Sequence, residues 1–257
     1  LPNRARLHER LTEALESEGP DPALMVIDLD GFKVVNDTLG HETGDELLKA
    51  VAMRMTSCLH EKDMLARVGG GEFAALITRA DAEVRATQTA QSIDEAMHAP
   101  FRIGEDVINM KAHIGIAPTL KGQVPATEIV RRADVAMFAA KNDRLERVRT
   151  YSPAMDEALQ LRRTINSELD LALMNNQLKL VYQPLVCART GKVTSAEALM
   201  RWPDKPGLAG SPGVFIPIAE ESGLISKLGA WALDQAMLEI KRQKTIPIAV
   251  NVSPVQF

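Results

Sequence analysis

The strongest constraint on the fold is a regular alternation of short apolar runs with amphipathic stretches in the first half of the chain. Residues 23–29 form an apolar run that closes on Asp28 and Asp30, a pattern typical of a buried strand. Apolar residues then recur at helical spacing between about 44 and 60. Two apolar segments flank three glycines at 69–71, which predicts a hairpin. Strands that alternate with helices predict an α/β layer architecture.

The same pattern continues to a boundary near Tyr151-Ser152-Pro153. Pro153 suits the first turn of a helix that runs to about Asn175. We therefore assign one domain to residues 1–152 and a second to residues 153–257. The further elements that we expect are helices over 82–99, 127–141 and 228–243, strands over 107–117, 179–184, 192–201 and 247–252, and a Pro/Gly-rich loop over 203–213.

Charge and cysteine usage exclude several classes of protein. The 30 basic residues are outnumbered by 34 acidic ones, and the net charge of −4 argues against a nucleic-acid polymer as partner. No apolar run approaches the roughly 20 residues of a membrane-spanning helix, so we expect no membrane segment in this chain. Two isolated cysteines and five scattered histidines argue against disulfides and zinc, and favour a cytoplasmic location.

The first group of polar residues lies at the carboxyl end of the strand over 23–29. Asp28 and Asp30 stand where α/β sheets commonly bind ligands, and carboxylates of this kind bind Mg²⁺ together with substrate phosphates. Asn36 and Asp45 follow, in what we expect to be one loop and the start of a helix. Asp and Asn are also favoured at strand ends and helix caps, so spacing alone leaves the structural reading open.

A longer pattern in residues 1 to about 152 resembles the GGDEF domain of the diguanylate cyclase family. It consists of Asp28-x-Asp30-x-Phe32-Lys33-x-x-Asn36-Asp37-x-x-Gly40-His41-x-x-Gly44-Asp45, Arg67-x-Gly69-Gly70-Gly71-Glu72-Phe73 and Ala133-Asp134-x-Ala136-Met137-Phe138-x-Ala140-Lys141. The resemblance implies a central five-stranded sheet flanked by helices, and a reaction that joins two GTP molecules into cyclic di-GMP. It also implies that Asp28 and the Leu29 carbonyl hold a metal ion, that Asn36 and Asp45 bind guanine, and that Lys141 faces phosphate.

Three positions depart from the family pattern. Gly71 stands where the signature has a metal-binding Asp or Glu, and glycine supplies no side-chain oxygen. The product-inhibition motif Arg-x-x-Asp appears as His60-x-x-Asp63, and the family's Gly-Arg-Asn after the late helix appears as Arg144-Leu145-Glu146. We therefore expect a domain that has lost cyclase activity and its inhibitory site, and that binds GTP in a regulatory role.

A second group of residues surrounds Glu197. On composition alone Glu197 reads as a solvated strand residue with Arg201 as its surface partner. The order of motifs across 155–257, however, resembles the EAL phosphodiesterase family: Tyr182-Gln183-Pro184, Glu197-Ala198-Leu199-x-Arg201-Trp202, Phe215-Ile216-Pro217-x-Ala219-Glu220 and Val250-Asn251-Val252-Ser253-x-x-Gln256-Phe257. That family hydrolyses cyclic di-GMP in a (β/α) barrel with two Mg²⁺ or Mn²⁺ ions.

By position, the resemblance makes Glu197 a catalytic metal ligand and Asn251 a second metal ligand. Arg201 would contact phosphate, and Gln183 and Leu199 would line the cyclic di-GMP pocket. A full barrel takes about 250 residues, so the second half reads as an incomplete TIM-like barrel and the chain as part of a longer protein.

We expect that longer protein to hydrolyse cyclic di-GMP; the alternative is a non-enzymatic receptor that binds cyclic di-GMP and acts through a protein partner. The expected partners are GTP and cyclic di-GMP, with a homodimer as one possible assembly, and the longer protein could carry a membrane segment.

Overall fold

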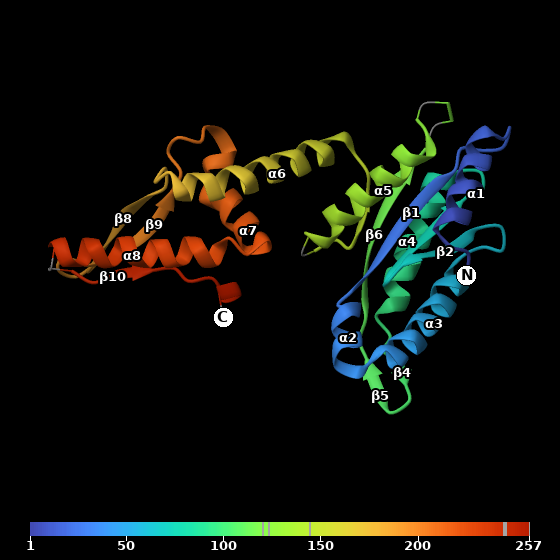
Figure 1. The fold of residues 1–257 in the computed structure, drawn as a ribbon, viewed down its shortest axis with the longest axis horizontal. Helices are drawn as coiled ribbons and strands as arrows, with labels where there is room; N and C mark the ends of the chain where they lie inside the picture. Colours follow the sequence, from blue (N-terminus) through green and yellow to red (C-terminus); the bar gives the residue numbers. More distant parts are fainter. Residues whose placement is uncertain (120, 123, 144, 244–245, 257) are drawn as a thin grey trace. The chain divides into compact units, whose positions relative to one another are not determined.

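The computed structural model describes residues 1–119, 121–122, 124–143, 145–243 and 246–256. The chain forms two units, Leu1–Asp156 and Glu157–Phe257. Figure 1 shows the order of the helices and strands along the chain.

The first unit is built on a five-stranded sheet of order β2-β3-β1-β6-β7, which confirms the expected central sheet. The central strand β1 pairs antiparallel with both neighbours, so that Asp28 lies opposite Glu72 on one side and His113 on the other. The sheet strands are β1 (Ala23–Asp30), β2 (Met64–Gly69), β3 (Glu72–Ile77), β6 (Lys111–Pro118) and β7 (Val148–Thr150). A separate hairpin consists of β4 (Phe101–Ile103) and β5 (Asp106–Ile108).

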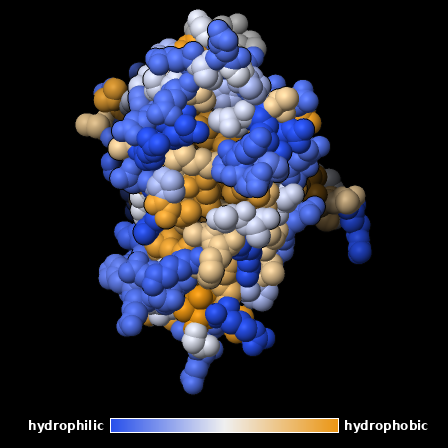
Figure 2. All heavy atoms as spheres, turned by 90° about the vertical axis from the view of Figure 1, so that its right-hand side faces the viewer, coloured by the Kyte–Doolittle hydropathy of each residue, from blue (hydrophilic) through white to orange (hydrophobic). Residues whose placement is uncertain are grey.

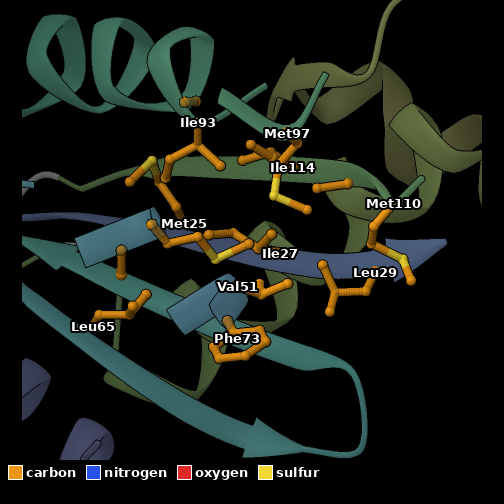
Figure 3. Packing of buried hydrophobic residues seen from close by; sticks show 14 of the residues in the cluster. Met25, Ile27, Leu29, Val51, Leu65, Phe73, Ile93, Met97, Met110 and Ile114 are labelled. Carbon is orange, nitrogen blue, oxygen red and sulfur yellow. The ribbon is translucent and has the colours of Figure 1, made fainter. Parts of the chain in front are cut away.

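Helices cover both faces of this sheet, because the side chains of β1 alternate between two apolar clusters. Met25, Ile27 and Leu29 pack with Phe73, Val51 and Ile93 on one face (Figure 3). Leu24 and Val26 pack on the other face with residues of α1 and α5. The helices are α1 (Arg4–Glu16), α2 (Phe32–Leu39), α3 (His41–Cys58), α4 (Ala82–Met97) and α5 (Ala126–Lys141).

Helix α5 lies unusually close to strand β6 at Gly115. A Cβ atom on Gly115 would come 2.1 Å from the Ala133 carbonyl oxygen and 2.1 Å from the Met137 amide nitrogen. Both of these are backbone atoms of α5, so no larger residue fits here unless the helix moves. Gly115 therefore sets the distance between α5 and the sheet.

The second unit carries a three-stranded sheet of order β10-β9-β8. Strand β8 (Lys179–Val186) pairs antiparallel with β9 (Val193–Arg201), and β9 pairs parallel with β10 (Ile248–Val250). Its helices are α6 (Pro153–Met174), which begins in the first unit, α7 (Pro212–Ser222) and α8 (Ile225–Gln243). Short 3₁₀ turns span Gly207–Gly210 and Pro254–Gln256. The core is formed by α6, α7 and α8, where Trp202 meets Phe215 edge to face at 6.0 Å.

Three segments differ from the sequence-based prediction. Residues 32–39, expected as loop, form α2, which begins after Gly31 in the left-handed conformation (φ 74°). The strand expected over 107–117 is divided into β5 and β6. Helix α7 begins inside the segment expected as a loop, because Pro212 occupies the first turn, where the missing N–H costs nothing.

Candidate functional site

The first site is a hollow of about 550 Å³ at the carboxyl end of β1. Asp28 and Leu29 come from β1, Asn36 from α2 and Lys141 from the end of α5. The glycines at 69–71 also line the hollow, and the Leu29 N–H donates to the Gly71 carbonyl at 3.1 Å. The fold therefore brings together four of the five residues predicted for this half, although they lie up to 113 positions apart in the sequence. Lys33 also lines the hollow, although the prediction gave it no role. Its position three residues after Asp30, in the same motif, could have indicated that it lies near the site.

Lys141 and Asp28 form an ion pair inside this hollow. The Lys141 Nζ donates to Asp28 Oδ2 at 2.5 Å, and the Asp28 side chain is only 16% exposed. An ammonium group at this point compensates the carboxylate, and it is also the kind of group that binds phosphate.

The predicted guanine ligand Asp45 lines a different hollow, of about 780 Å³. The lining there is mixed: Asp45, Lys49 and Arg67 are charged, and the apolar residues are Leu1, Leu48, Ala52, Met53 and Phe73. Figure 2 shows apolar side chains gathered across the middle of one face of the molecule, between hydrophilic regions. A lining with both apolar surface and a few charged groups suits a flat, partly polar ligand better than a bare phosphate.

Gly71 adds no side chain to the first site, and its backbone does not require glycine. Among the three consecutive glycines only Gly70 has a positive φ, of 44°. A Cβ on Gly71 would lie 3.0 Å from the Phe32 Cβ, so a larger residue requires Phe32, at the start of α2, to shift by a few tenths of an ångström. Glu72, the next residue, pairs in register with Asp28.

GGDEF domains use divalent metal ions, so the donor atoms of the first unit bear on that chemistry. Asp28 is already neutralised by Lys141, and Gly71 contributes no side-chain oxygen. No group of three or more His, Cys, Asp or Glu residues suited to a metal is found in the part of the chain that the structure describes. The residues present in this hollow therefore do not fit a metal centre built by the protein alone.

A buried histidine lies beside the ion pair. His113 is the register partner of Asp28 in β6 and is 8% exposed. Its Nδ1 finds no hydrogen-bond partner among the described residues. Burial lowers the pKa of His113, which keeps the ring uncharged at neutral pH.

At the position of the family's product-inhibition motif, which reads His60-x-x-Asp63 here, Asp63 forms an ion pair with Arg79. The Asp63 side chain is fully buried and receives two hydrogen bonds from Arg79, at 3.1 and 2.9 Å. It also accepts a hydrogen bond from the backbone N–H of His60 at 3.1 Å. Because its oxygens are engaged and shielded, Asp63 has no face left for a ligand. Arg144, from the other departing motif, lies outside the described residues.

In the second unit, four of the predicted residues share one face of the β8–β9 ladder. Glu197, Leu199 and Arg201 alternate with the buried Ala196 and Ala198, and Gln183 is the register partner of Glu197. From the end of β10, Asn251 reaches the same place, and its Nδ2 donates to Glu197 Oε1 at 2.7 Å.

The pair offers one carboxylate and one amide oxygen, donors that suit a hard divalent cation, although here too the described residues supply no group of three metal-binding side chains. Glu197 and Asn251 would hold such an ion, and it would supply a Lewis acid for a phosphodiester.

Sequence reasoning missed the contacts that hold the loop after β10. Ser253 Oγ donates to Glu220 Oε1 at 2.6 Å, and Gln256 Oε1 accepts from the Ser253 N–H at 3.0 Å. All three residues belong to quoted motifs, but their partnership depends on the packing of α7 and α8 against the loop. Phe257, from the same motif, lies outside the described residues.

Comparison with known proteins agrees with this geometry. The family model described as "Diguanylate cyclase, GGDEF domain" matches residues 1–147, and the EAL domain model matches residues 166–257. The chain therefore belongs to the GGDEF family, and its GGDEF domain is followed by an EAL domain. Proteins with this combination act in cyclic di-GMP signalling.

The chain is 36% identical over 265 residues to the bifunctional diguanylate cyclase/cyclic di-GMP phosphodiesterase MucR of Pseudomonas aeruginosa, covering all of this chain and 38% of MucR. It is 35% identical to the solved GGDEF domain of PA1120 from the same organism, over 59% of this chain and 97% of that one, with a TM-score of 0.56.

The S helix-GGDEF-EAL structure of Vibrio cholerae LapD covers 99% of this chain, and the chain covers 60% of it. The TM-score is 0.59, but at 18% identity this likeness concerns the fold alone. The chain spans between 31% and 42% of the curated relatives that it matches. None of the helices in the described part of the chain combines the length and apolar character needed to cross a membrane.

Proposed function

We propose that the GGDEF domain of this chain is a GTP-binding regulatory domain without cyclase activity, and that the protein to which it belongs hydrolyses cyclic di-GMP through its EAL domain. The observation that carries the first part is the pairing of Asp28 with Lys141 beside a glycine at position 71. Only one of the two expected metal-binding carboxylates is present, and it already has a cationic partner.

Removal of a catalytic carboxylate has a large effect on rate. A general base alone contributes about 10²- to 10⁴-fold. The hollow keeps the groups that would bind a nucleotide, with Asn36 for the base and Lys141 for phosphate. Binding without turnover is therefore the function that the remaining residues support best.

The hydrolase part of the proposal rests on the second unit. Asn251 is hydrogen-bonded to Glu197. Leu199 and Arg201 lie on the same face of β9 as Glu197, and Gln183 lies opposite Glu197 on β8. Relatives include the cyclic di-GMP phosphodiesterase PdeR of Escherichia coli, 35% identical over the whole of this chain.

The first test measures synthesis in the full-length protein with radiolabelled GTP and Mg²⁺. We expect no cyclic di-GMP above the rate without enzyme. Gly71→Asp should gain measurable synthesis, whereas Gly71→Asn, of equal size but without the charge, should not. Synthesis by the unaltered protein would show that the domain is a cyclase.

The second test measures hydrolysis of cyclic di-GMP by the same protein with Mg²⁺ or Mn²⁺. Glu197→Ala should abolish turnover, whereas the neighbouring Ser195→Ala should retain it. Tight binding of cyclic di-GMP without any hydrolysis would instead identify the protein as a receptor.

A further inference from the structure

Gly44 stands in the first turns of α3, beneath the amide of Asn36. A Cβ atom at this position would lie 1.9 Å from Asn36 Oδ1 and 3.1 Å from its Cγ. The same Cβ would lie 3.5 Å from Phe32 Cζ, an ordinary van der Waals distance. The space left by the missing side chain is therefore occupied chiefly by the Asn36 amide.

The backbone itself does not call for glycine at position 44. Gly44 lies inside a helix and is absent from the residues with positive φ, unlike Gly40, which joins α2 to α3 at a φ of 88°. Glycine inside a helix destabilises it relative to alanine. The backbone therefore does not explain the glycine at position 44, whereas the space that it leaves for the Asn36 side chain does.

Packing against Gly44 also orients the Asn36 amide. The Asn36 side chain makes no hydrogen bond to any described residue, so the contact with α3 is what holds its rotamer. With Oδ1 turned toward Gly44, the Nδ2 group with its two N–H donors is the end left for a ligand. Such a donor matches a purine that carries a carbonyl oxygen and mismatches one that carries an amino group.

We propose that Gly44 determines base specificity as a positioning residue, by seating the Asn36 amide so that the GGDEF domain selects guanine over adenine. This inference rests on the proposed GTP binding. Asp45, the next residue along α3, lines a different hollow, so the inference concerns the Asn36 amide alone.

The test compares four forms of the protein by titration calorimetry with GTP and with ATP: unaltered, Gly44→Ala, Asn36→Ala and the double variant. Gly44→Ala should lower the affinity for GTP about tenfold, the effect of losing one well-placed hydrogen bond to a ligand, and should change that for ATP less than twofold. In the Asn36→Ala background, the further change to alanine at 44 should have no effect on GTP, because the amide that it displaces is gone.

Urea unfolding of each variant serves as the control for correct folding. The added methyl meets the end of a flexible side chain, so the urea midpoint of Gly44→Ala should be unchanged or higher, and the double variant has room for the methyl in any case. Thr43→Ala, in the same helical turn, is the matched control and should leave the ratio of GTP to ATP affinity as it is.

Two results would overturn the inference in distinguishable ways. If Asn36→Ala lowers the preference for GTP and Gly44→Ala leaves it intact, Gly44 has no positioning role and GTP binding stands. If GTP binds and neither variant alters its affinity, Asn36 does not contact the base and the inference fails; if GTP does not bind at all, the proposed nucleotide function fails as well.

Discussion

The ammonium group of Lys141 lies 2.5 Å from Oδ2 of Asp28, so the last residue of α5 neutralises the carboxylate at the end of the central strand. A ligand phosphate that enters this hollow competes with Asp28 for the same cation. The two residues should therefore have opposite effects on nucleotide binding.

We expect Lys141→Met to weaken GTP binding about tenfold or more, since a hydrogen bond to a charged group contributes about 1.5–3 kcal/mol. Asp28→Asn should leave GTP binding unchanged or strengthen it in the presence of a chelator, because it removes a competing negative charge. Calorimetric titration with and without Mg²⁺ checks both. A loss of affinity in Asp28→Asn equal to that in Lys141→Met would indicate that Asp28 binds the nucleotide through a metal ion.

The buried pair of Asp63 and Arg79 should stabilise the first unit. Arg79→Ala leaves a fully buried carboxylate without its cation, and breaking such a pair costs about 3–5 kcal/mol. The double variant with Asp63→Ala should recover part of that loss. Urea unfolding followed by circular dichroism measures the change. Both tryptophans, Trp202 and Trp231, lie in the second unit, so their fluorescence transition is an internal control that should not move.

Acid should weaken the ion-pair network that joins α5 to the first turn of α6. Hydrogen bonds from Arg131 lower the pKa of Glu128 and of Asp156 to about 2 in each case. Because both folded-state values lie below the ordinary ones, the unfolded chain binds more protons between pH 4.5 and 2. The stability that these groups contribute is thus complete above about pH 4.5 and is lost as the pH falls toward 2.

Arg131→Met provides the measurement for this network. The difference in unfolding free energy between the unaltered chain and Arg131→Met should be largest near neutral pH and should shrink steadily below pH 4.5. A difference that stays constant down to pH 2.5 would mean that the network contributes nothing through its charges.

Limited proteolysis should cleave the second unit of this 257-residue chain first. Its described sheet has three strands, and Val181, Leu185 and Val186 on strand β8 are 42–53% exposed. Partly exposed apolar strands have few contacts that oppose local opening. We expect a resistant fragment of residues 1 to about 152, identified by mass spectrometry. Equal resistance of both units in a monomeric sample would contradict this.

Apolar patterning was sufficient for β1, β2, β3 and most of the longer helices, whereas the three-residue strand β7 was not predicted and the five-stranded sheet was expected only from the family resemblance. Helix α2 was missed because its eight residues give too short a pattern and begin at a left-handed glycine. The first site was predictable in composition: Asp28, Asn36 and Lys141 do line one hollow. Asp45 lines a different hollow because of the way α3 packs, and the local sequence pattern does not predict that packing.

Partnerships between distant residues were the least predictable part. Glu197 and Asn251 are 54 positions apart and meet because the short strand β10 pairs in parallel with the middle of β9, where Ala249 lies opposite Glu197. Arg79 was not singled out, because nothing near residue 79 signals that its guanidinium covers Asp63. Local pattern identifies candidate groups, whereas packing decides which of them remain accessible.

Gly71 and Gly115 differ in what the molecule would lose by changing them. Position 115 is closed by backbone atoms 2.1 Å away, whereas a Cβ at position 71 would lie 3.0 Å from the Phe32 Cβ and needs a displacement of only a few tenths of an ångström. An inherited change at 71 can therefore remove or restore a carboxylate while the scaffold persists, but a change at 115 disturbs the scaffold itself.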